Sequence, residues 1–464
     1  MTASETVYAA LMRLAMPVSR ATLRLGPVLP GGTRGKSWRG LAGMLGAADR
    51  LVEWSRRERD SSRGLVWFHA PSVGEGLQAR AVIQAVRRLR PELQLIYTYF
   101  SPSAVPFADG IPADFTGYLP FDTPAVTGTV LDCLRPSAIV FSKNEIWPNL
   151  TREGARRGIP ALLLSATLPR RSSRTRGPAA GLLRTAHARL AMVGAISTGD
   201  AARYQDFGVR PDRLFLMGDA RFDQVQERME RVDREGPLLR HLRNDERPTL
   251  VAGSTWPADE EVLLEAVGTL RSSVVPLRLI AAPHEPTPDA LRSFEAMAES
   301  RGLRTVRLER FLETHSDGNG LEPDPGGDTL AAGHRNGDES DIILIDRVGI
   351  LGDLYAAGQM AFVGGGFGSA GLHSVLEPAA FGIPVAFGPH HANAREAEDL
   401  VQRGAGASVA GARELIDVLG RWATDEDARK KAGQLSAAYV EENLGAAERG
   451  ARVLLELIGE SDPP

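Results

Sequence analysis

The chain has 464 residues, of which 43% are hydrophobic and 24% are charged, and its formal net charge is −4. This length is typical of two domains that each bury a core, and the slightly acidic balance argues against a dedicated nucleic-acid-binding protein. The single cysteine, Cys133, excludes an internal disulfide and a cysteine metal cluster, and the histidines form no pair at metal-ligand spacing. We therefore expect a globular protein of a reducing compartment, with no tightly held metal and no nucleic-acid partner.

The N-terminal segment, residues 1–60, contains an apolar stretch from Val7 to Leu29 that arginines interrupt. Against one acidic residue, Glu5, residues 1–40 carry these basic ones: Arg13, Arg20, Arg24, Arg34, Lys36 and Arg39. No uninterrupted apolar run reaches the roughly 18 residues that a membrane-spanning helix needs. The pattern predicts a basic amphipathic helix, which either lies on an anionic membrane surface or packs on its own domain.

Short apolar runs alternate with helical patterns over residues 61–228 and again over residues 245–435. In the first region we expect strands at 65–70, 93–100, 138–142, 161–165 and 193–197. In the second region we expect strands at 249–253, 277–282, 342–346, 360–364 and 384–388. The alternation predicts an α/β fold of two Rossmann-like lobes, each a doubly wound parallel sheet. Because such sheets bind ligands at the carboxyl ends of their strands, a central cleft between the lobes is the expected site.

Three further segments complete the organisation of the chain. The charged, turn-rich stretch around 226–247 predicts the boundary between the lobes. Residues 313–340 are rich in Gly, Asp and Asn and predict a mobile surface insertion in the second lobe. Residues 425–458 form a long helical pattern, and we assign residues 436–464 to a C-terminal helix.

Residues 366–371 spell Gly-x-Gly-x-x-Gly after an expected strand and before a helical pattern. In a dinucleotide-binding protein an acidic residue would end the next strand, about 20 residues further on. Here that strand ends at Gly388-Pro389-His390, which argues against a dehydrogenase. The loop instead predicts an anion site, in which amides around Gly366 and Gly368 and the positive end of a helix dipole bind a phosphate.

Two side chains follow this glycine loop. His373 and Glu377 are four residues apart, so we expect them on one face of the first turns of the helix that the loop opens. There Glu377 can accept hydrogen bonds from ribose hydroxyls, and the whole arrangement suits a nucleoside monophosphate. Taken alone, the two residues equally fit a solvated helix charge and a packing histidine.

Two carboxylates follow expected strands of the first lobe. Glu75 lies at the start of a helix, where the helix N-terminus keeps a carboxylate ionised and available as a general base. Ser72 and Glu75 also have the spacing of a capping box, in which Glu75 bonds only to backbone. Glu145 is expected in a loop, because Pro148 suits the first position of the next helix.

Eight segments in chain order carry a more specific signal: HAPSVGE (69–75), YLPFD (118–122), NEIWPN (144–149), GDARFD (218–223), GSTWPADE (253–260), APHEP (282–286), DRVGILGDLY (346–355) and GGGFGSAGLHSVLEPAAFGIPVAFGP (364–389). Together they resemble the 3-deoxy-D-manno-octulosonic acid (Kdo) transferases, in the branch with a GGGFG loop. The similarity covers roughly residues 60–410, and the combination of separated motifs is specific.

The resemblance implies a GT-B glycosyltransferase that inverts the configuration of the transferred sugar. Glu75 would be its catalytic base, and Glu145 and Arg221 would stabilise the transition state. Most members of the family have a lysine where this chain has Arg221. The positive charge is kept, but a guanidinium bonds with a different geometry from an ammonium.

The implied donor substrate is CMP-Kdo, whose single phosphate needs no metal ion and no cofactor. In agreement, no DxD motif follows an expected strand. The resemblance assigns the nucleotide to Pro283, His284, Val348, Gly349, Ile350, Gly366, Gly368, His373, Ser374, Val375, Leu376 and Glu377.

The chain departs from the common family pattern at three of these places. The usual PRH appears as Pro283-His284-Glu285, and GEL as Gly349-Ile350-Leu351. Ser374 stands where an asparagine is usual, so one nucleotide contact is expected to differ.

The implied acceptor is a lipid A precursor, lipid IVA, at the cytoplasmic face of the bacterial inner membrane, in lipopolysaccharide core biosynthesis. The basic N-terminal segment would then attract anionic headgroups, with roughly 1 kcal/mol for each basic residue near the surface. A cluster of arginines, Arg170, Arg171, Arg174 and Arg176, either meets acceptor phosphates or is simply solvated.

Two other functions remain open from the sequence. A UDP-sugar transferase or a UDP-GlcNAc 2-epimerase of the same fold would keep the glycine loop but not the SVGE and NEIWPN segments. A non-catalytic relative that binds nucleotide or lipid would have lost its chemistry, although Glu75, Glu145 and Arg221 are all present.

Overall fold

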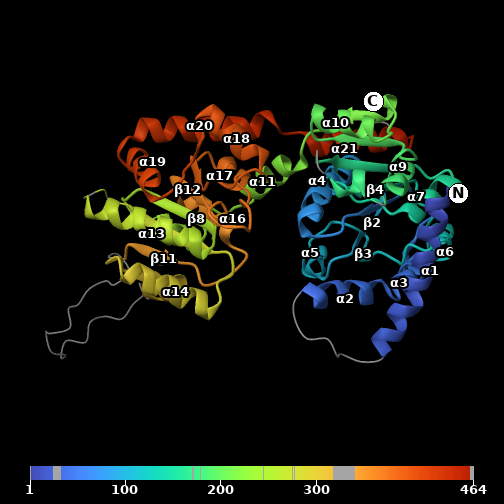
Figure 1. Ribbon diagram of the computed structural model, residues 1–464, viewed down its shortest axis with the longest axis horizontal. Helices are drawn as coiled ribbons and strands as arrows, with labels where there is room; N and C mark the ends of the chain where they lie inside the picture. Colours follow the sequence, from blue (N-terminus) through green and yellow to red (C-terminus); the bar gives the residue numbers. More distant parts are fainter. Residues whose placement is uncertain are drawn as a thin grey trace. The chain divides into compact units, whose positions relative to one another are not determined.

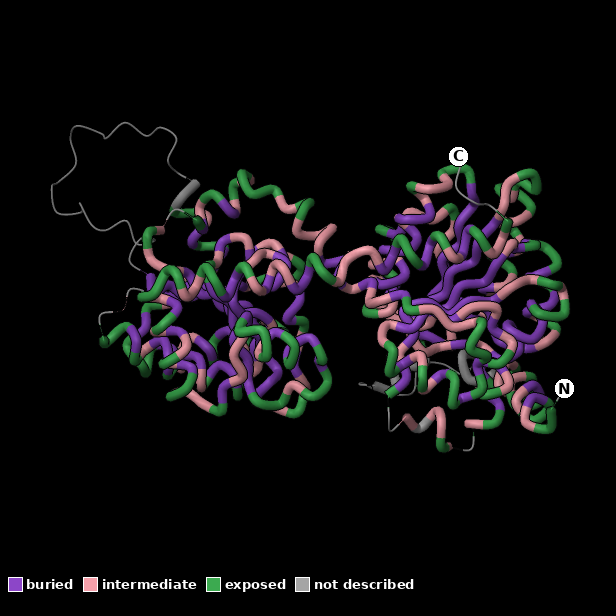
Figure 2. Tube along the Cα trace, turned by 90° about the horizontal axis from the view of Figure 1, so that it is seen from above, coloured by how far each residue is buried: buried purple, intermediate pink, exposed green. Residues whose placement is uncertain are grey.

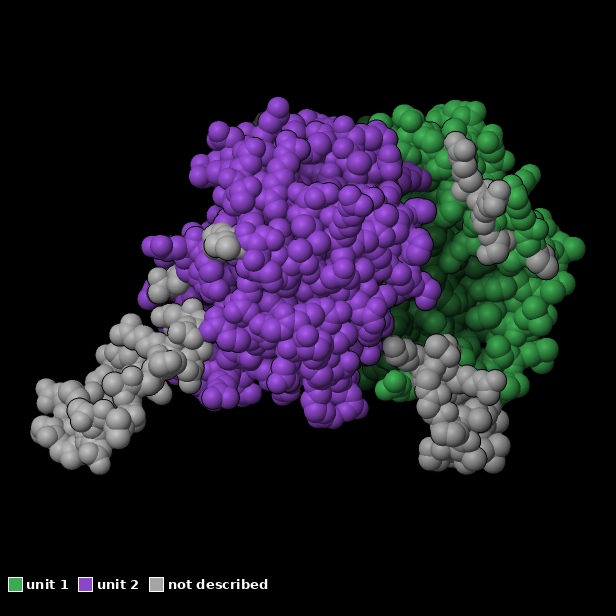
Figure 3. Space-filling view, turned by 60° about the vertical axis from the view of Figure 1, so that its left-hand side comes forward, with its two compact units in different colours: residues 1–224, 443–464 green, residues 225–442 purple. Residues whose placement is uncertain are grey.

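The computed structural model describes residues 2–24, 33–169, 172–177, 179–243, 245–273, 275, 277–316 and 340–459. The chain divides into two compact units, coloured separately in Figure 3. Unit 1 comprises Met1–Gln224 and Asn443–Pro464, and unit 2 comprises Val225–Glu442. Most of the insertion expected over 313–340 lies outside the described residues.

Unit 1 contains a seven-stranded parallel sheet in the order β3-β2-β1-β4-β5-β6-β7. Its strands are β1 (Leu65–His69), β2 (Gln94–Tyr99), β3 (Phe115–Tyr118), β4 (Ala138–Ser142), β5 (Ala161–Ala166), β6 (Met192–Ala195) and β7 (Leu214–Leu216). Every residue of β1, β2, β4 and β5 is buried. Such continuous apolar runs are typical of strands that helices cover on both faces.

The helices of unit 1 pack on both faces of this sheet (Figures 1 and 2). They are α1 (Ala3–Arg24), α2 (Thr33–Met44), α3 (Ala47–Glu58), α4 (Val73–Leu89), α5 (Val105–Ala108), α6 (Pro124–Leu134), α7 (Pro148–Arg156), α8 (Ser173–Arg176), α9 (Ala180–His187), α10 (Thr198–Asp206) and α21 (Ala446–Leu457). Val66 and Phe68 of β1 join the core with α4 and α21. Leu65 and Trp67, which point the other way, join the core with α3, α6, α7, α9 and α10.

Unit 2 repeats this plan with the strand order β10-β11-β9-β8-β12-β13-β14, again all parallel. Its strands are β8 (Thr249–Thr255), β9 (Arg278–Pro283), β10 (Thr305–Arg307), β11 (Ile342–Leu344), β12 (Met360–Val363), β13 (Val385–Phe387) and β14 (Gly406–Ser408). Its helices are α12 (Pro237–Arg243), α13 (Pro257–Ser272), α14 (Pro288–Glu299), α15 (Leu308–Ser316), α16 (Leu351–Leu354), α17 (Leu376–Ala380), α18 (Arg395–Arg403), α19 (Ala412–Thr424) and α20 (Glu426–Glu442). Helix α11 (Ala220–Glu230) spans the junction of the units.

The C-terminal helical pattern forms two helices rather than one. Helix α20 packs on α17 of unit 2, whereas α21 packs on α4 of unit 1. Gly445, with φ 87°, provides the left-handed turn before α21. The carboxylate of Asp223 accepts hydrogen bonds from the amides of Gly445 (2.7 Å) and Ala447 (3.0 Å) and so fixes the start of α21. The helical pattern over 425–458 is therefore divided into two helices, and the C-terminal helix begins at Ala446 and not at residue 436.

Helix α1 has one docked face and one exposed face. Glu5, which is buried, forms an ion pair with Arg189, and the Tyr8 hydroxyl donates to Asp122 (2.9 Å). The opposite face carries an apolar stripe, in which Val7, Leu11, Leu14 and Val18 are 59%, 59%, 65% and 63% exposed. None of the helices in the described residues has the length and apolar character to cross a bilayer.

The predicted fold class is confirmed, since each unit is a doubly wound parallel sheet with helices on its faces. A strand lies in each of the ten places where the sequence predicts one. The cleft expected between the lobes concerns their mutual placement, and it stays a prediction.

Candidate active site

Glu75 lies in the first turn of α4, directly after β1, as the sequence predicts. Its carboxylate is 18% exposed, accepts a hydrogen bond from the Ser72 hydroxyl, and pairs with Lys143, whose Nζ is 3.4 Å from Oε1. In a capping box the Ser72 oxygen would accept the amide of Glu75, but the Ser72 side chain makes no such cap. The reciprocal capping box is therefore not formed, and the Glu75 carboxylate is bound by Ser72 and Lys143 in addition to a local backbone hydrogen bond.

Lys143 is a residue of this site that the sequence analysis missed. It directly follows β4 and adopts a left-handed conformation (φ 66°), which is uncommon for a residue with a side chain. Hydrogen bonds to strand β5 and the residues after it fix this backbone: the Lys143 amide donates to Leu164 (2.8 Å), and its carbonyl accepts from Thr167 (3.2 Å). The signal in the sequence was a cation between an expected strand and the NEIWPN segment, but only the fold brings it to Glu75.

Glu145 lies in the loop between β4 and α7, and Pro148 is the first residue of α7, so this prediction is confirmed. Arg174 holds the loop in two ways. Its guanidinium is 3.8 Å from Oε2 of Glu145 and donates to the carbonyl of Asn144 (2.5 Å). Arg174 of the predicted arginine cluster thus contacts Glu145, and Arg176 is exposed. The other two members, at 170–171, lie outside the described residues.

The environments of the two carboxylates shift their pKa values in opposite directions. Burial acts to raise the pKa of Glu75, but the Ser72 hydroxyl and the Lys143 ammonium outweigh it, so this pKa lies below its ordinary value. Burial raises the pKa of Glu145, with Arg174 opposing the shift and Glu75 adding to it. One group is thus a stable carboxylate, and the other is a weaker acid beside it, which is the pattern of a site with distinct base and stabilising roles.

Trp147 follows Glu145 and is fixed by a buried histidine. The Trp147 indole Nε1 donates to Nε2 of His69 (3.0 Å), whose Nδ1 lies 3.1 Å from the hydroxyl of Thr98. Burial lowers the pKa of His69 to about 3. A neutral imidazole with its proton on Nδ1 matches both partners, so His69 is a structural acceptor for Trp147.

Arg221, the predicted cation, is the second residue of α11 and belongs to unit 1. Its side chain is 37% exposed and forms an ion pair with Asp219, with Nη2 2.8 Å from Oδ2 and Nε donating at 2.9 Å. The guanidinium is therefore oriented by Asp219, and part of its charge is neutralised before any substrate binds.

In unit 2 the glycine loop follows β12, but it does not open a helix. Residues 364–375 separate β12 from α17, and two loop amides are already bound by a carboxylate. The fully buried Asp259 of α13 accepts the amides of Gly365 (2.8 Å) and Phe367 (3.1 Å). Gly366 lies so close to Gly388 that a Cβ would be 2.6 Å from its nitrogen. The loop is thus built around an internal anion, but the amides of Gly366 and Gly368 are not among those that Asp259 binds, so their contact with a substrate phosphate stays a prediction.

The free amides lie further along the chain. Within the described residues, the amides of Ser374, Val375 and Leu376 donate to no protein acceptor. Val375 and Leu376 are fully buried, whereas Ser374 is exposed. The amides of Gly366 and Gly368 also lack a protein acceptor in the described chain.

His373 lies before α17 and not on it, so the expectation of a shared helix face with Glu377 is wrong. The reason is that the loop amide of His373 bonds back to the carbonyl of Gly364 (3.2 Å) and delays the helix. The His373 ring instead ends an aromatic stack. His284, which follows Pro283 at the end of β9, stacks against both Trp256 and His373, with ring centroids 4.7 and 4.5 Å away.

Glu377 is half-buried in the first turn of α17, and burial raises its pKa, with Arg228 opposing the shift. Arg228 of α11 is a second residue that the sequence analysis missed. It donates to the carbonyl of Gly349 (3.4 Å) and lies 3.6 Å from Asp353. It therefore connects the predicted segments around Glu377 and Gly349.

The segment before α16 combines an exposed apolar side chain with a left-handed glycine. Val348 is 75% exposed, Gly349 adopts φ 93°, and Ile350 is the N-cap residue of α16. An apolar side chain this exposed beside a polar site is suited to contact the face of a ligand ring. The structure thus brings the unit 2 predictions into two connected groups, one around His284 and one around Glu377.

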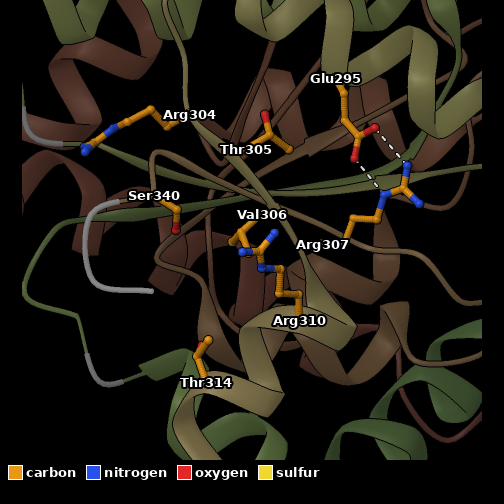
Figure 4. A pocket seen from close by; sticks show the side chains of 8 residues that line it. All are labelled: Glu295, Arg304, Thr305, Val306, Arg307, Arg310, Thr314 and Ser340. Atoms are coloured by element: carbon orange, nitrogen blue, oxygen red, sulfur yellow. Dashed lines mark hydrogen bonds and ion pairs between the residues drawn. The ribbon is translucent and has the colours of Figure 1, made fainter. Parts of the chain in front are cut away.

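Within the described residues, no group of three or more His, Cys, Asp or Glu side chains could hold a metal ion. The expectation that the reaction needs no metal or cofactor stays a prediction. A pocket of about 390 Å³ beside β10, drawn in Figure 4, contains none of the predicted site residues.

Comparison with known sequences places the chain among glycosyltransferases. The family described as 3-Deoxy-D-manno-octulosonic-acid transferase (kdotransferase) matches residues 46–224. The 3-deoxy-D-manno-octulosonic acid transferase of Bordetella pertussis is 28% identical over 411 residues, which cover 85% of this chain and 87% of that protein. The enzyme of the same name from Haemophilus influenzae is 26% identical over 404 residues, covering 85% and 86%.

Solved structures with the same fold include a UDP-GlcNAc 2-epimerase from Neisseria meningitidis bound to UDP-GlcNAc, with a TM-score of 0.59 and 11% identity. A glycosyltransferase from Rickettsia africae has a TM-score of 0.53 and 11% identity. Each similarity covers 86% of this chain and 100% of the other. At these identities the likeness concerns fold alone, and the two lobes are of the GT-B type.

Proposed function

The chain belongs to the Kdo transferase family of glycosyltransferases, and from this premise we propose that it transfers Kdo from CMP-Kdo to a lipid A precursor with inversion at the anomeric carbon. The observation that carries the proposal is the pair of unit 1 carboxylates after β1 and β4, with Glu75 held by Lys143 and Glu145 next to Arg174. A base and a stabilising carboxylate are what this transfer requires.

In the reaction an acceptor hydroxyl oxygen attacks the anomeric carbon of Kdo, and the bond from that carbon to the phosphate oxygen breaks. Glu75 takes the hydroxyl proton, and CMP leaves with the bonding electrons. Its depressed pKa keeps Glu75 ionised at neutral pH, and Lys143 and Ser72 hold the carboxylate in place. Glu145 lies beside it and stabilises the positive charge that the sugar develops.

Unit 2 supplies groups suited to a nucleoside monophosphate. The free amides of Ser374, Val375 and Leu376 are donors for the phosphate oxygens. The stack of Trp256, His284 and His373 offers an aromatic edge. Glu377 is a carboxylate that can accept ribose hydroxyls, and Arg228 balances its charge.

A cation from Arg221 completes the electrostatic requirement, since the departing phosphate gains negative charge. Asp219 orients this guanidinium through Nε and Nη2. Because only one phosphate leaves, amides and one guanidinium can neutralise it, and we propose that the transfer needs no metal ion and no cofactor.

We further propose that the enzyme works on the cytoplasmic face of the inner membrane, where its lipid acceptor is made. The support is the apolar stripe of α1, formed by Val7, Leu11, Leu14 and Val18 on the face opposite the docked one. A helix with such a stripe binds the headgroup region in the plane of the membrane.

The test is incubation of the full-length chain with a tetra-acylated lipid A precursor and CMP-Kdo, which is generated in situ, with the products read by mass spectrometry. We expect products heavier by one or more Kdo residues. Glu75→Gln should lower the rate at least about 100-fold while CMP binding persists. Glu92→Gln, an exposed carboxylate of unit 1, is the matched control and should leave the rate unchanged.

Two results would overturn the proposal. Turnover with a UDP-sugar and none with CMP-Kdo would assign the chain to a different GT-B activity. CMP binding by a protein that shows no turnover, with Glu75→Gln indistinguishable from the natural chain, would identify a binding protein.

A further inference from the structure

A pocket of about 400 Å³ lies on unit 1, at the carboxyl end of α7 and beside the start of α1. It is lined by Arg152, Ala155, Arg156 and Arg189. None of these residues belongs to the proposed transfer reaction. Helix α1 borders the same region, because its Glu5 pairs with Arg189.

Arg152 is the buried member of this group. Its side chain is only 6% exposed, and Nε and Nη2 donate to Oε1 of Glu153 at 3.3 and 3.0 Å. Its Nη1 is buried and has no acceptor within the described part of the chain. A buried guanidinium donor without a partner is unfavourable, so an acceptor supplied from outside would be bound strongly.

The charges around the pocket are shared rather than paired one to one. Glu153 contacts Arg156 (3.6 Å) and Arg157 (2.9 Å) as well as Arg152, and Arg157 is further paired with Asp132. The carboxylates of Glu5 and Asp122 also interact electrostatically with Arg152. Arg152 thus lies among several carboxylates, but none of them in the described part of the chain accepts a hydrogen bond from its Nη1.

The pocket beside β10 is also lined by arginines, but two of them are paired differently. There Arg307 makes a bidentate pair with Glu295, at 2.6 and 2.8 Å (Figure 4). Arg304 of the same pocket reaches the carboxylate of Asp341 (3.3 Å). Arg152 differs from these arginines. Its Nε and Nη2 both donate to one carboxylate oxygen, that of Glu153, and its third nitrogen, Nη1, has no acceptor in the described part of the chain.

We propose that the pocket of Arg152, Arg156 and Arg189 binds a phosphate group. A tetrahedral oxyanion can accept several guanidinium hydrogen bonds at once, and planar guanidinium groups match phosphate oxygens well. The site is independent of the transfer reaction, and its phosphate comes either from an anionic lipid headgroup or from solution.

The first experiment is a calorimetric titration of the full-length protein with inorganic phosphate. Saturating CMP is present throughout, so that the nucleotide site of unit 2 cannot contribute. We expect saturable binding. Arg156→Gln should weaken it about threefold, because this side chain is 70% exposed, and Arg152→Met about tenfold or more. Far-ultraviolet circular dichroism verifies that both variants are folded.

Arg57→Gln is the matched control. Arg57 lies on α3, is 72% exposed and pairs with Glu53 of the same helix, so it repeats the exposure and pairing of Arg156 at another place. Phosphate binding by Arg57→Gln should equal that of the natural chain. No saturable binding, or equal affinity in the Arg156→Gln and control variants, would overturn the proposal.

A second arm distinguishes the sources of the phosphate. Vesicles of phosphatidylcholine with and without one fifth phosphatidylglycerol are sedimented with each variant. If Arg156→Gln, but not Arg57→Gln, loses phosphatidylglycerol-dependent binding, the site holds a lipid phosphate. If vesicle binding is the same for both while phosphate binding differs, the site holds a soluble anion. If the titration shows no saturable phosphate binding, the proposal is overturned whatever the vesicle experiment shows.

Discussion

The indole Nε1 of Trp256 donates a hydrogen bond to Nε2 of His373, 3.1 Å away. The residues are 117 positions apart and follow two neighbouring strands of unit 2, β8 and β12. Unit 1 holds a similar pair, Trp147 and His69, at the ends of the neighbouring strands β4 and β1. In each pair the imidazole nitrogen accepts a hydrogen bond from the indole N–H, so this nitrogen carries no proton, and burial lowers the pKa of both histidines.

We predict that Trp256→Phe weakens CMP binding about threefold to tenfold. The change keeps the aromatic stack on His284 but removes the donor that orients His373, and one hydrogen bond contributes about 0.5–1.5 kcal/mol. The dissociation constant of CMP, measured by calorimetry, checks this. Trp147→Phe removes the corresponding bond in unit 1 and should leave CMP affinity unchanged. Equal affinities for all three proteins would show that the indole does not orient the site.

Asp259 is predicted to stabilise unit 2 through the glycine loop. Asp259→Ala would leave the buried amides of Gly365 and Phe367 without an acceptor, which costs about 1–3 kcal/mol for each unsatisfied group. The free energy of unfolding from urea titration should fall by at least that amount. A matched change, Asp289→Ala on the exposed start of α14, should have little effect. If the two variants unfold alike, the loop does not depend on this carboxylate.

The strands that the sequence analysis missed are β3, β7, β10 and β14, and each lies at an edge of its sheet. They are three or four residues long and mostly half-exposed. An edge strand has one neighbour and little surface to bury, so it needs no continuous apolar run. Central strands such as β1 and β4 are buried throughout and are visible in the sequence for that reason.

Some residues of the candidate site could likewise be predicted from the sequence, and others could not. Glu75 and Glu145 could be placed from the sequence, because residues after parallel strands gather at one edge of the sheet. The partner of the glycine loop could not, since Asp259 lies 106 residues before Gly365 and looks like an ordinary acidic residue of a first helical turn. Lys143 and Arg228 were missed because a cation in a loop or on a helix surface requires no explanation until its partners are known.

Arg228 is predicted to support donor binding. Arg228→Met removes the cation near Glu377 and Asp353, so two carboxylates would repel each other and the departing phosphate. We expect the dissociation constant of CMP to rise about tenfold. Arg231→Met, directly after the same helix and paired with Glu227, is the matched control and should bind CMP normally. Unchanged affinity in Arg228→Met would exclude this residue from the nucleotide site.

Chelation tests the proposed independence from metal. After treatment with EDTA and gel filtration, the transfer rate should equal that of the untreated enzyme, because one phosphate can be neutralised by amides and a guanidinium. The rate is followed as CMP release. Loss of activity that Mg²⁺ restores would show that a cation takes part in the reaction.

Lys143→Met is predicted to shift the pH dependence of the reaction. Glu75 acts as a base only when ionised, and Lys143 helps to hold its pKa below the ordinary value. Activity is present above that pKa and is lost as pH falls through it. Without the ammonium the pKa rises, so the acid limb of kcat/KM must move to higher pH. At pH 5 we expect a rate about two- to fivefold lower than that of the natural chain, with recovery toward neutral pH. Lys143→Arg keeps the charge and should retain most of the natural profile. A uniform loss at all pH values, with the limb unmoved, would mean that Lys143 supports the loop and not the ionisation of Glu75.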